Sequence, residues 1–181
     1  MLVSVAPLLK LPIGDWTTYE VAESPVDPHG ENAALLDAGF TSVDATIRGT
    51  HTDPGVLFEG TASGMTAAQC SRCLIAIESP VIAEFAEQYY ATMDVATGAG
   101  LVAGPVDSKT IGSDFRVDLT PLLVEELIIA TPFAPLCRPD CRGLCLACGE
   151  DLNDRPHQHD AGGDPRWARL QDLEGFRAER E

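Results

Sequence analysis

The stretch CRPDCRGLCLAC at residues 137–148 holds four cysteines, and CSRC at residues 70–73 holds two more. Two of the spacings are Cys-x-x-Cys, which allows one turn of chain to present two thiolates to the same ion. Zinc takes four such ligands in a tetrahedron, so two turns brought together by the fold complete one site. These motifs therefore predict a structural metal site that ties two distant parts of the chain together.

One or two zinc ions are predicted, because the cysteines are followed closely by two histidines. In the preferred arrangement, the pair at 70–73 joins the first two cysteines of 137–148, and the last two cysteines join the histidines. An alternative places all four cysteines of 137–148 around one ion, and the spacing does not choose between them. A solvated loop position for the two histidines also stays open. The candidate ligands are Cys70, Cys73, Cys137, Cys141, Cys145, Cys148, His157 and His159.

Two other uses of the cysteines have less support. A thiol–disulfide oxidoreductase places Cys-x-x-Cys at a helix N-terminus in a thioredoxin-like unit, whereas CSRC lies among predicted strands and CLAC (145–148) lies in a loop. A catalytic zinc needs an open ligand position and a nearby acid or base. Glu150 and Asp151 follow CLAC, but the chain has no His-Glu-x-x-His motif. We therefore expect a protein that is not an enzyme.

The charge of the chain bears on its partners. Its 12 Lys and Arg residues face 28 Asp and Glu residues, a formal net charge of −16. Affinity for nucleic acid comes mainly from cations that neutralise phosphates, so autonomous RNA binding is disfavoured. A basic protein partner fits this charge better. The alternative is that the acidity only keeps the protein soluble.

The beginning of the chain predicts a cytoplasmic location. MLVSVAPLLKLPIG (1–14) is apolar, but it lacks a leading positive segment and a small-residue cleavage site. No apolar run approaches the ~20 residues that span a bilayer, so no membrane association is expected. Disulfides are rare in the cytoplasm, which favours metal binding by clustered cysteines.

Strand patterns dominate the middle of the chain. Apolar and polar residues alternate from Phe40 onward, as in a half-buried strand, and the turn HTDPG (51–55) separates this stretch from a second strand at 56–64. Residues 65–90 predict another strand pair, with CSRC near its start. Pro80 should mark a sheet edge or a bend, because proline cannot donate to a strand ladder.

The main helix is predicted at 118–131. Thr120 is the expected N-cap, Pro121 suits the first helical position, and Pro132 ends the helix. Residues 91–113 are rich in glycine and small residues and predict an irregular connector.

Together these elements predict an α+β fold. It consists of an antiparallel sheet that could close in a barrel-like manner, one main helix and a zinc-stapled C-terminal segment. A single domain is expected over residues 1–160, including the cysteine segment 137–159. The tail 161–181 is expected to hold a terminal helix at 164–180, where Asp164 can N-cap.

Four stretches of the chain resemble the YceD family of bacterial and plastid proteins. The block Gly-Leu-Cys in the third stretch is the most specific part of the resemblance. His157 and His159 stand where many members have Cys-x-Cys, a change that keeps zinc chemistry available. The stretches are CSRCL (70–74), VDLTPLLVEELIIATPFAPLC (117–137), DCRGLCLACGEDLN (140–153) and DPRWARLQDL (164–173).

The resemblance implies a non-catalytic role in large ribosomal subunit assembly and accumulation of 23S rRNA. Genes of this family often lie beside one for a zinc-binding protein of the large subunit, so a basic large-subunit protein is the implied partner. Contact with precursor 23S rRNA is then expected to be indirect. A zinc-binding interaction module unrelated to ribosomes is the remaining alternative.

Three arginines lie inside the cysteine motifs. Arg72, Arg138 and Arg142 could form a local basic surface for a partner on this acidic protein. The alternative is that they only balance the charge of metal-bound thiolates.

Overall fold

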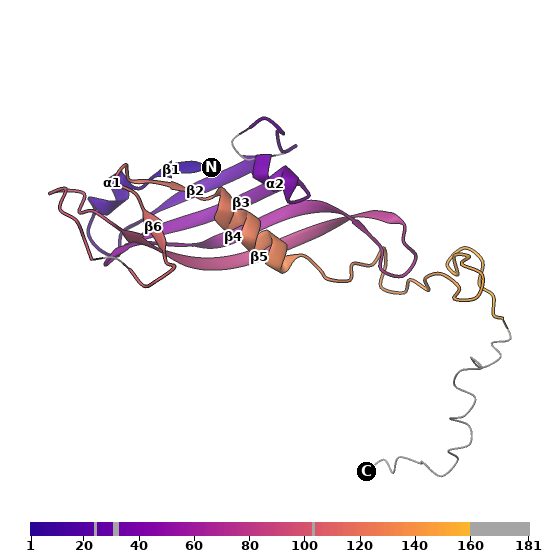
Figure 1. The fold of residues 1–181 in the computed structure, drawn as a ribbon. Coiled ribbons are helices and arrows are strands. Elements are labelled where there is room, and N and C mark those ends of the chain that lie inside the picture. Colours follow the sequence, from indigo (N-terminus) through magenta and orange to yellow (C-terminus); the bar gives the residue numbers. More distant parts are fainter. Residues whose placement is uncertain (24, 31–32, 103, 160–181) are drawn as a thin grey trace, which may run out of the picture.

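A computed structural model describes residues 1–23, 25–30, 33–102 and 104–159 of the chain. A five-stranded sheet in the order β2-β3-β4-β5-β6 forms most of the protein, and β1 and β7 make a separate antiparallel pair. Three helices accompany the strands (Figure 1). The elements are β1 (Leu2–Ser4), α1 (Ala6–Leu9), β2 (Trp16–Glu23), α2 (Ala33–Asp37), β3 (Phe40–Thr52), β4 (Gly55–Gln69), β5 (Ala76–Ala91), β6 (Lys109–Ile111), β7 (Arg116–Asp118) and α3 (Thr120–Ala130).

The α+β prediction is confirmed, but the sheet is open. Its first four strands are antiparallel, as expected, whereas β6 joins β5 in parallel. Among the described strands the two edges, β2 and β6, do not pair with each other, so the barrel-like closure is wrong. β6 has only three residues and adds little curvature, because closure needs long, tilted strands around the whole ring.

Alternating burial confirms the predicted strand at 40–47. Val43, Ala45 and Ile47 are buried, while the residues between them are exposed. Their partners in β4 alternate in the same way, with Ala45 opposite Ala62. One face of the sheet therefore packs into the core, where the buried leucines of α1, α2 and α3 join it.

The strand boundaries near the first cysteine motif differ from the prediction. β4 continues without a break to Gln69, and its ladder with β5 runs from Gly55–Tyr90 to Gln69–Ala76. CSRC therefore occupies the turn between β4 and β5, and does not begin a strand pair. Pro80 lies on a free edge, as predicted, because β6 pairs with β5 only at Tyr89–Ala91.

The main helix, α3, begins one residue earlier than the predicted N-cap implies. Leu119 is the N-cap and Thr120 is the first helical residue, which puts Pro121 at the second position. The Thr120 hydroxyl accepts a hydrogen bond from the Met1 amino group, so it serves the chain terminus and not the cap. Thr131 has extended backbone angles and ends the helix before Pro132, as predicted.

The cysteines form a second, separate core. Cys70, Cys73 and Cys141 are buried together with Leu136 and Leu144 packed against them. We call residues 70–75 and 133–159 the cysteine lobe. It contains no helix or strand among its residues, all of which are described, and it lies beyond the sheet end where β4 meets β5 (Figure 1).

The predicted terminal helix (164–180) and the tail that contains it (161–181) lie outside the described residues. Within the described residues, no helix combines the length and the apolar character that crossing a membrane requires.

Candidate metal centres

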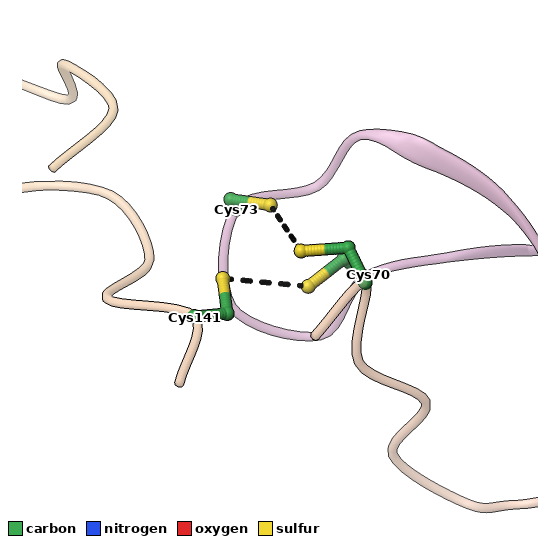
Figure 2. A group of neighbouring side chains, drawn as sticks. Cys70, Cys73 and Cys141 are labelled. Atoms are coloured by element: carbon green, nitrogen blue, oxygen red, sulfur yellow. Dashed lines mark hydrogen bonds between the residues drawn. The ribbon is translucent and has the colours of Figure 1, made fainter. Parts of the chain in front are cut away.

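Four cysteines from two distant stretches converge in the first group. Cys70 and Cys73 come from the β4–β5 turn, and Cys137 and Cys141 come from the segment after α3. All four sulfur atoms lie within 4.8 Å of one another, and all are free thiols. Figure 2 shows Cys70, Cys73 and Cys141 directed toward a common centre.

The spacing of these sulfur atoms suits a tetrahedral ion. The Sγ atoms of Cys70 and Cys141 are 3.8 Å apart, and those of Cys73 and Cys137 are 3.7 Å apart. In a regular tetrahedron with zinc–sulfur bonds of about 2.3 Å, the sulfur–sulfur edges are about 3.8 Å. The first group could therefore hold a metal ion without moving its ligands far.

The second group consists of the other two cysteines and both histidines. The ligand atoms of Cys145, Cys148, His157 and His159 lie within 4.8 Å of one another. The Cys148 Sγ is 3.2 Å from the His157 Nε2, and the two imidazole rings meet edge to face with centroids 4.9 Å apart. The structure thus assembles the two groups that the preferred arrangement describes.

Both Cys-x-x-Cys turns have the same backbone geometry. The N–H of Cys70 donates to the Ile75 carbonyl (2.9 Å), and the N–H of Leu74 donates to the Cys70 carbonyl (2.9 Å). Cys145 repeats the first bond with Glu150 (2.8 Å), and Gly149 repeats the second with Cys145 (2.8 Å). In each turn the residue after the second cysteine has a positive φ, which only glycine adopts without strain.

Backbone N–H groups lower the pKa of the first cysteine in each turn. The Cys73 N–H is the main cause for Cys70, and the Cys148 N–H is the main cause for Cys145; both pKa values fall to about 6. Burial, followed by the neighbouring thiols, raises the pKa of Cys137 to about 12. Each turn therefore presents one thiolate near neutral pH, the form that binds metals.

The His157 ring is oriented for ligation. Its Nδ1 lies 2.7 Å from the Arg155 carbonyl, which can only accept a hydrogen bond. In the neutral ring, Nδ1 then carries the proton and Nε2 offers its lone pair toward Cys148. The same carbonyl is the main cause that raises the pKa of His157.

The two groups differ in exposure. Three of the four cysteines in the first group are buried, whereas Cys148 and His159 in the second group are exposed. Water and chelators reach the second group more easily, so an ion there should exchange faster.

Asn153 connects its own part of the cysteine lobe to Cys141 and Arg142, and the sequence did not predict this role. Its Nδ2 donates to the Cys141 sulfur (3.4 Å), and its Oδ1 accepts from the Arg142 N–H (2.8 Å). Such hydrogen bonds to ligands orient them and tune the metal site. The available signal was its place at the end of DCRGLCLACGEDLN (140–153).

The structure brings together two of the three arginines that were candidates for partner binding. Arg72 and Arg142 line the same hollows between the two cysteine groups. Arg72 also donates to the Cys141 carbonyl (2.7 Å), which ties the β4–β5 turn to the late segment. Arg138 lies apart from these hollows and pairs with Asp140 at 3.6 Å.

Comparison with known proteins points to one family. The family model described as large ribosomal RNA subunit accumulation protein YceD matches residues 58–174. An uncharacterized protein of Mycobacterium tuberculosis is 32% identical over 176 residues, which cover 97% of this chain and 82% of the relative. An uncharacterized protein of Mycobacterium leprae is 36% identical over 136 residues, or 72% of this chain and 58% of the relative. No solved structure matches.

Proposed function

The chain belongs to the YceD family of large ribosomal RNA subunit accumulation proteins, and on that premise we propose that it is a non-catalytic factor in large-subunit assembly. It would act in the cytoplasm by supporting the accumulation of 23S rRNA. The partner would be a basic protein of the large subunit, and contact with precursor 23S rRNA would be indirect, because the net charge of −16 repels phosphate.

We propose further that the cysteine lobe is a structural zinc module. The carrying observation is the approach of eight ligand atoms in two groups, each within 4.8 Å. Four thiolates, or two thiolates and two imidazoles, are the donor sets that structural zinc sites use. Zinc bound in this way would supply cross-links in a segment that has no helix or strand of its own, and chemistry at the ion is not part of the proposal.

The zinc ions would hold a surface for the partner. Arg72 and Arg142 would stand at its centre, because both residues line the hollows between the two groups. Arg138 would contribute from the periphery. This surface, the sheet and the helices would form one domain over 1–160, with 161–181 as an appended tail.

Metal analysis of the purified protein tests the zinc module. Two zinc ions and six thiols are expected per chain. Cys70→Ser with Cys73→Ser should remove one ion, and Cys145→Ser with Cys148→Ser should remove the other, so each double variant is the control for its counterpart. A metal-free protein with a reversible disulfide would instead establish the thiol oxidoreductase alternative.

Ribosome profiles test the assembly role. A strain depleted of the protein should accumulate less of the large subunit and its 23S rRNA, and the wild-type gene should restore both. The Cys70→Ser/Cys73→Ser gene should fail to restore them, while Arg138→Gln should restore them nearly fully. Normal large-subunit levels after depletion would reject the assembly role while leaving the zinc module intact.

A further inference from the structure

The sheet face that points away from the helices is uncovered among the described residues. Its residues alternate with those of the core, and they line up across four strands. Glu20 of β2, Thr46 of β3, Thr61 of β4 and Glu84 of β5 form one such line and are all exposed. We call the surface around this line the open face.

The open face forms a shallow trough. One hollow reaches from Trp16 to Glu84, a second reaches from Asp44 to Ile82, and the two share Thr46 and Thr61. The threonines form a low floor. Glu84 lines the first hollow, and Glu20 lies on β2 at the other end of the same line. Neighbouring strands lie about 4.8 Å apart, so the two positions are about 14 Å apart. This width admits a single polypeptide segment.

Three carboxylates on the open face have no cationic partner within the described part of the chain. They are those of Glu20, Asp44 and Glu84, since the ion pairs found among the described residues involve other carboxylates. Arg48 is the basic residue on this part of the sheet, and it already pairs with another carboxylate, because its Nε donates to Glu59 at 2.9 Å. Its guanidinium group also lies over the Trp16 ring, 5.8 Å from the centroid. The face therefore presents uncompensated negative charge.

Two apolar side chains stand among these carboxylates. Trp16 is 58% exposed and Ile82 is 72% exposed. Exposed apolar anchors beside unpaired charges are typical of protein-binding surfaces, where apolar contacts supply affinity and charges supply specificity.

We propose that the open face binds a lysine- and arginine-rich segment of a partner protein. The cations would pair with Glu20, Asp44 and Glu84, and apolar side chains between them would pack on Trp16 and Ile82. RNA is disfavoured here because its phosphates would face three carboxylates, and a second copy of this acidic chain is disfavoured for the same reason. The proposal needs neither zinc nor a ribosomal role, so it goes beyond the function proposed above.

The negative charge of the chain is concentrated on the part that carries the open face. Outside the cysteine lobe, residues up to 132 carry four Lys or Arg against eighteen Asp or Glu. The cysteine lobe carries four arginines against four carboxylates, before thiolates and any metal are counted. A basic segment is therefore attracted more strongly to the sheet body than to the lobe.

A binding assay with a defined peptide tests the open face. The probe is a fluorescent synthetic peptide of alternating arginine and alanine, titrated with the full chain and followed by anisotropy. The triple variant Glu20→Gln/Asp44→Asn/Glu84→Gln should bind about tenfold more weakly, since each exposed ion pair contributes a fraction of a kcal/mol. The control Asp37→Asn/Asp107→Asn/Asp154→Asn removes the same charge from other exposed positions and should retain most of the affinity.

Equal losses of affinity in the two triple variants would overturn the proposal, because binding would then follow net charge alone.

A matched pair of variants tests the apolar anchors with a peptide of alternating arginine and leucine. Ile82→Ser should weaken binding of this peptide, and Ile129→Ser on α3 should not. Single-stranded RNA is the last probe. If Glu20→Gln/Asp44→Asn/Glu84→Gln binds RNA more tightly than the wild type, the result would support a negatively charged open face. If the variant loses RNA binding that the wild type has, the result would contradict it.

Discussion

Leu74 and Gly149 occupy equivalent places in the two Cys-x-x-Cys turns, although only one of them is glycine. Their φ angles are +61° and +76°, in the left-handed region that L side chains rarely adopt. Gly149 after CLAC was a sequence signal for a tight turn after the thiolates. Leu74 carried no such signal, because leucine rarely adopts a left-handed backbone; its conformation belongs to the turn that its N–H closes by donating to the Cys70 carbonyl at 2.9 Å.

The first prediction concerns Gly149. Replacing it with alanine should weaken metal binding in the second group about fivefold, because a left-handed alanine costs about 1 kcal/mol. The first group should be unaffected. Competition with a chromophoric chelator measures both affinities. Gly100→Ala is the control, since a methyl group there meets no atom within 4 Å, and an equal effect of the two substitutions would contradict the assigned role.

The second prediction concerns Asn153. Asn153→Ala removes its hydrogen bonds to Cys141 and Arg142 and should lower the metal affinity of the first group by at least about tenfold. Asn153→Asp keeps the acceptor for the Arg142 N–H but loses the donor to sulfur, so it should fall between the wild type and Asn153→Ala. The same chelator competition ranks the three proteins. Identical affinities would mean that Asn153 does not support the site.

At the scale of elements, α3 links the sheet to the cysteine lobe. Its buried leucines, Leu122, Leu123 and Leu127, pack on the sheet, whereas Ile128 is 52% exposed despite its place in the predicted apolar face. The pattern of the helix predicted which residues could be buried, but the turn at Thr131 sets where the chain leaves the sheet.

The third prediction compares two positions on α3. Leu123→Ala should lower the free energy of unfolding by about 2–5 kcal/mol, because the fully packed leucine leaves a cavity. Ile129→Ala should change it by less than about 0.5 kcal/mol, because the isoleucine is 78% exposed. Urea denaturation measures both. Similar losses of unfolding free energy in the two variants would show that α3 contributes to stability through intrinsic helix propensity and not through packing.

At the scale of the whole molecule, two cores lie in one chain. The main core joins the inner sheet face to the helices and contains none of the cysteines. The second core consists of Cys70, Cys73 and Cys141 with a few apolar neighbours. Apolar clusters with few shared contacts unfold separately, so the body and the lobe should respond differently to metal removal.

The fourth prediction follows from this division. Chelation of bound metal should disorder the lobe and open its thiols to alkylation, yet leave the far-ultraviolet circular dichroism of the sheet nearly unchanged. The thermal transition of the body should shift by no more than a few degrees. Loss of the sheet signal on chelation would mean that the two cores form one cooperative unit.

The sequence by itself determined which residues are candidate ligands in this protein. Ligand types and local spacing made metal binding the leading hypothesis for the cysteines, alternation identified the inner face of β3, and Thr-Pro and Pro132 located α3 to within a residue. Each of these signals acts over a few residues, where covalent geometry and hydrogen bonding leave few choices. The resemblance that rested on the same motifs is confirmed by the family match.

Only the tertiary structure decided which cysteines meet. The 137–148 spacing allowed two ways to divide the cysteines between metal sites. The choice depended on where α3 ends relative to the β4–β5 turn. It also decided that the sheet stays open and that Glu20, Asp44 and Glu84 share one uncovered face. These outcomes depend on contacts between residues tens of positions apart, whose energies come from burial and strand register and are not encoded in any local pattern.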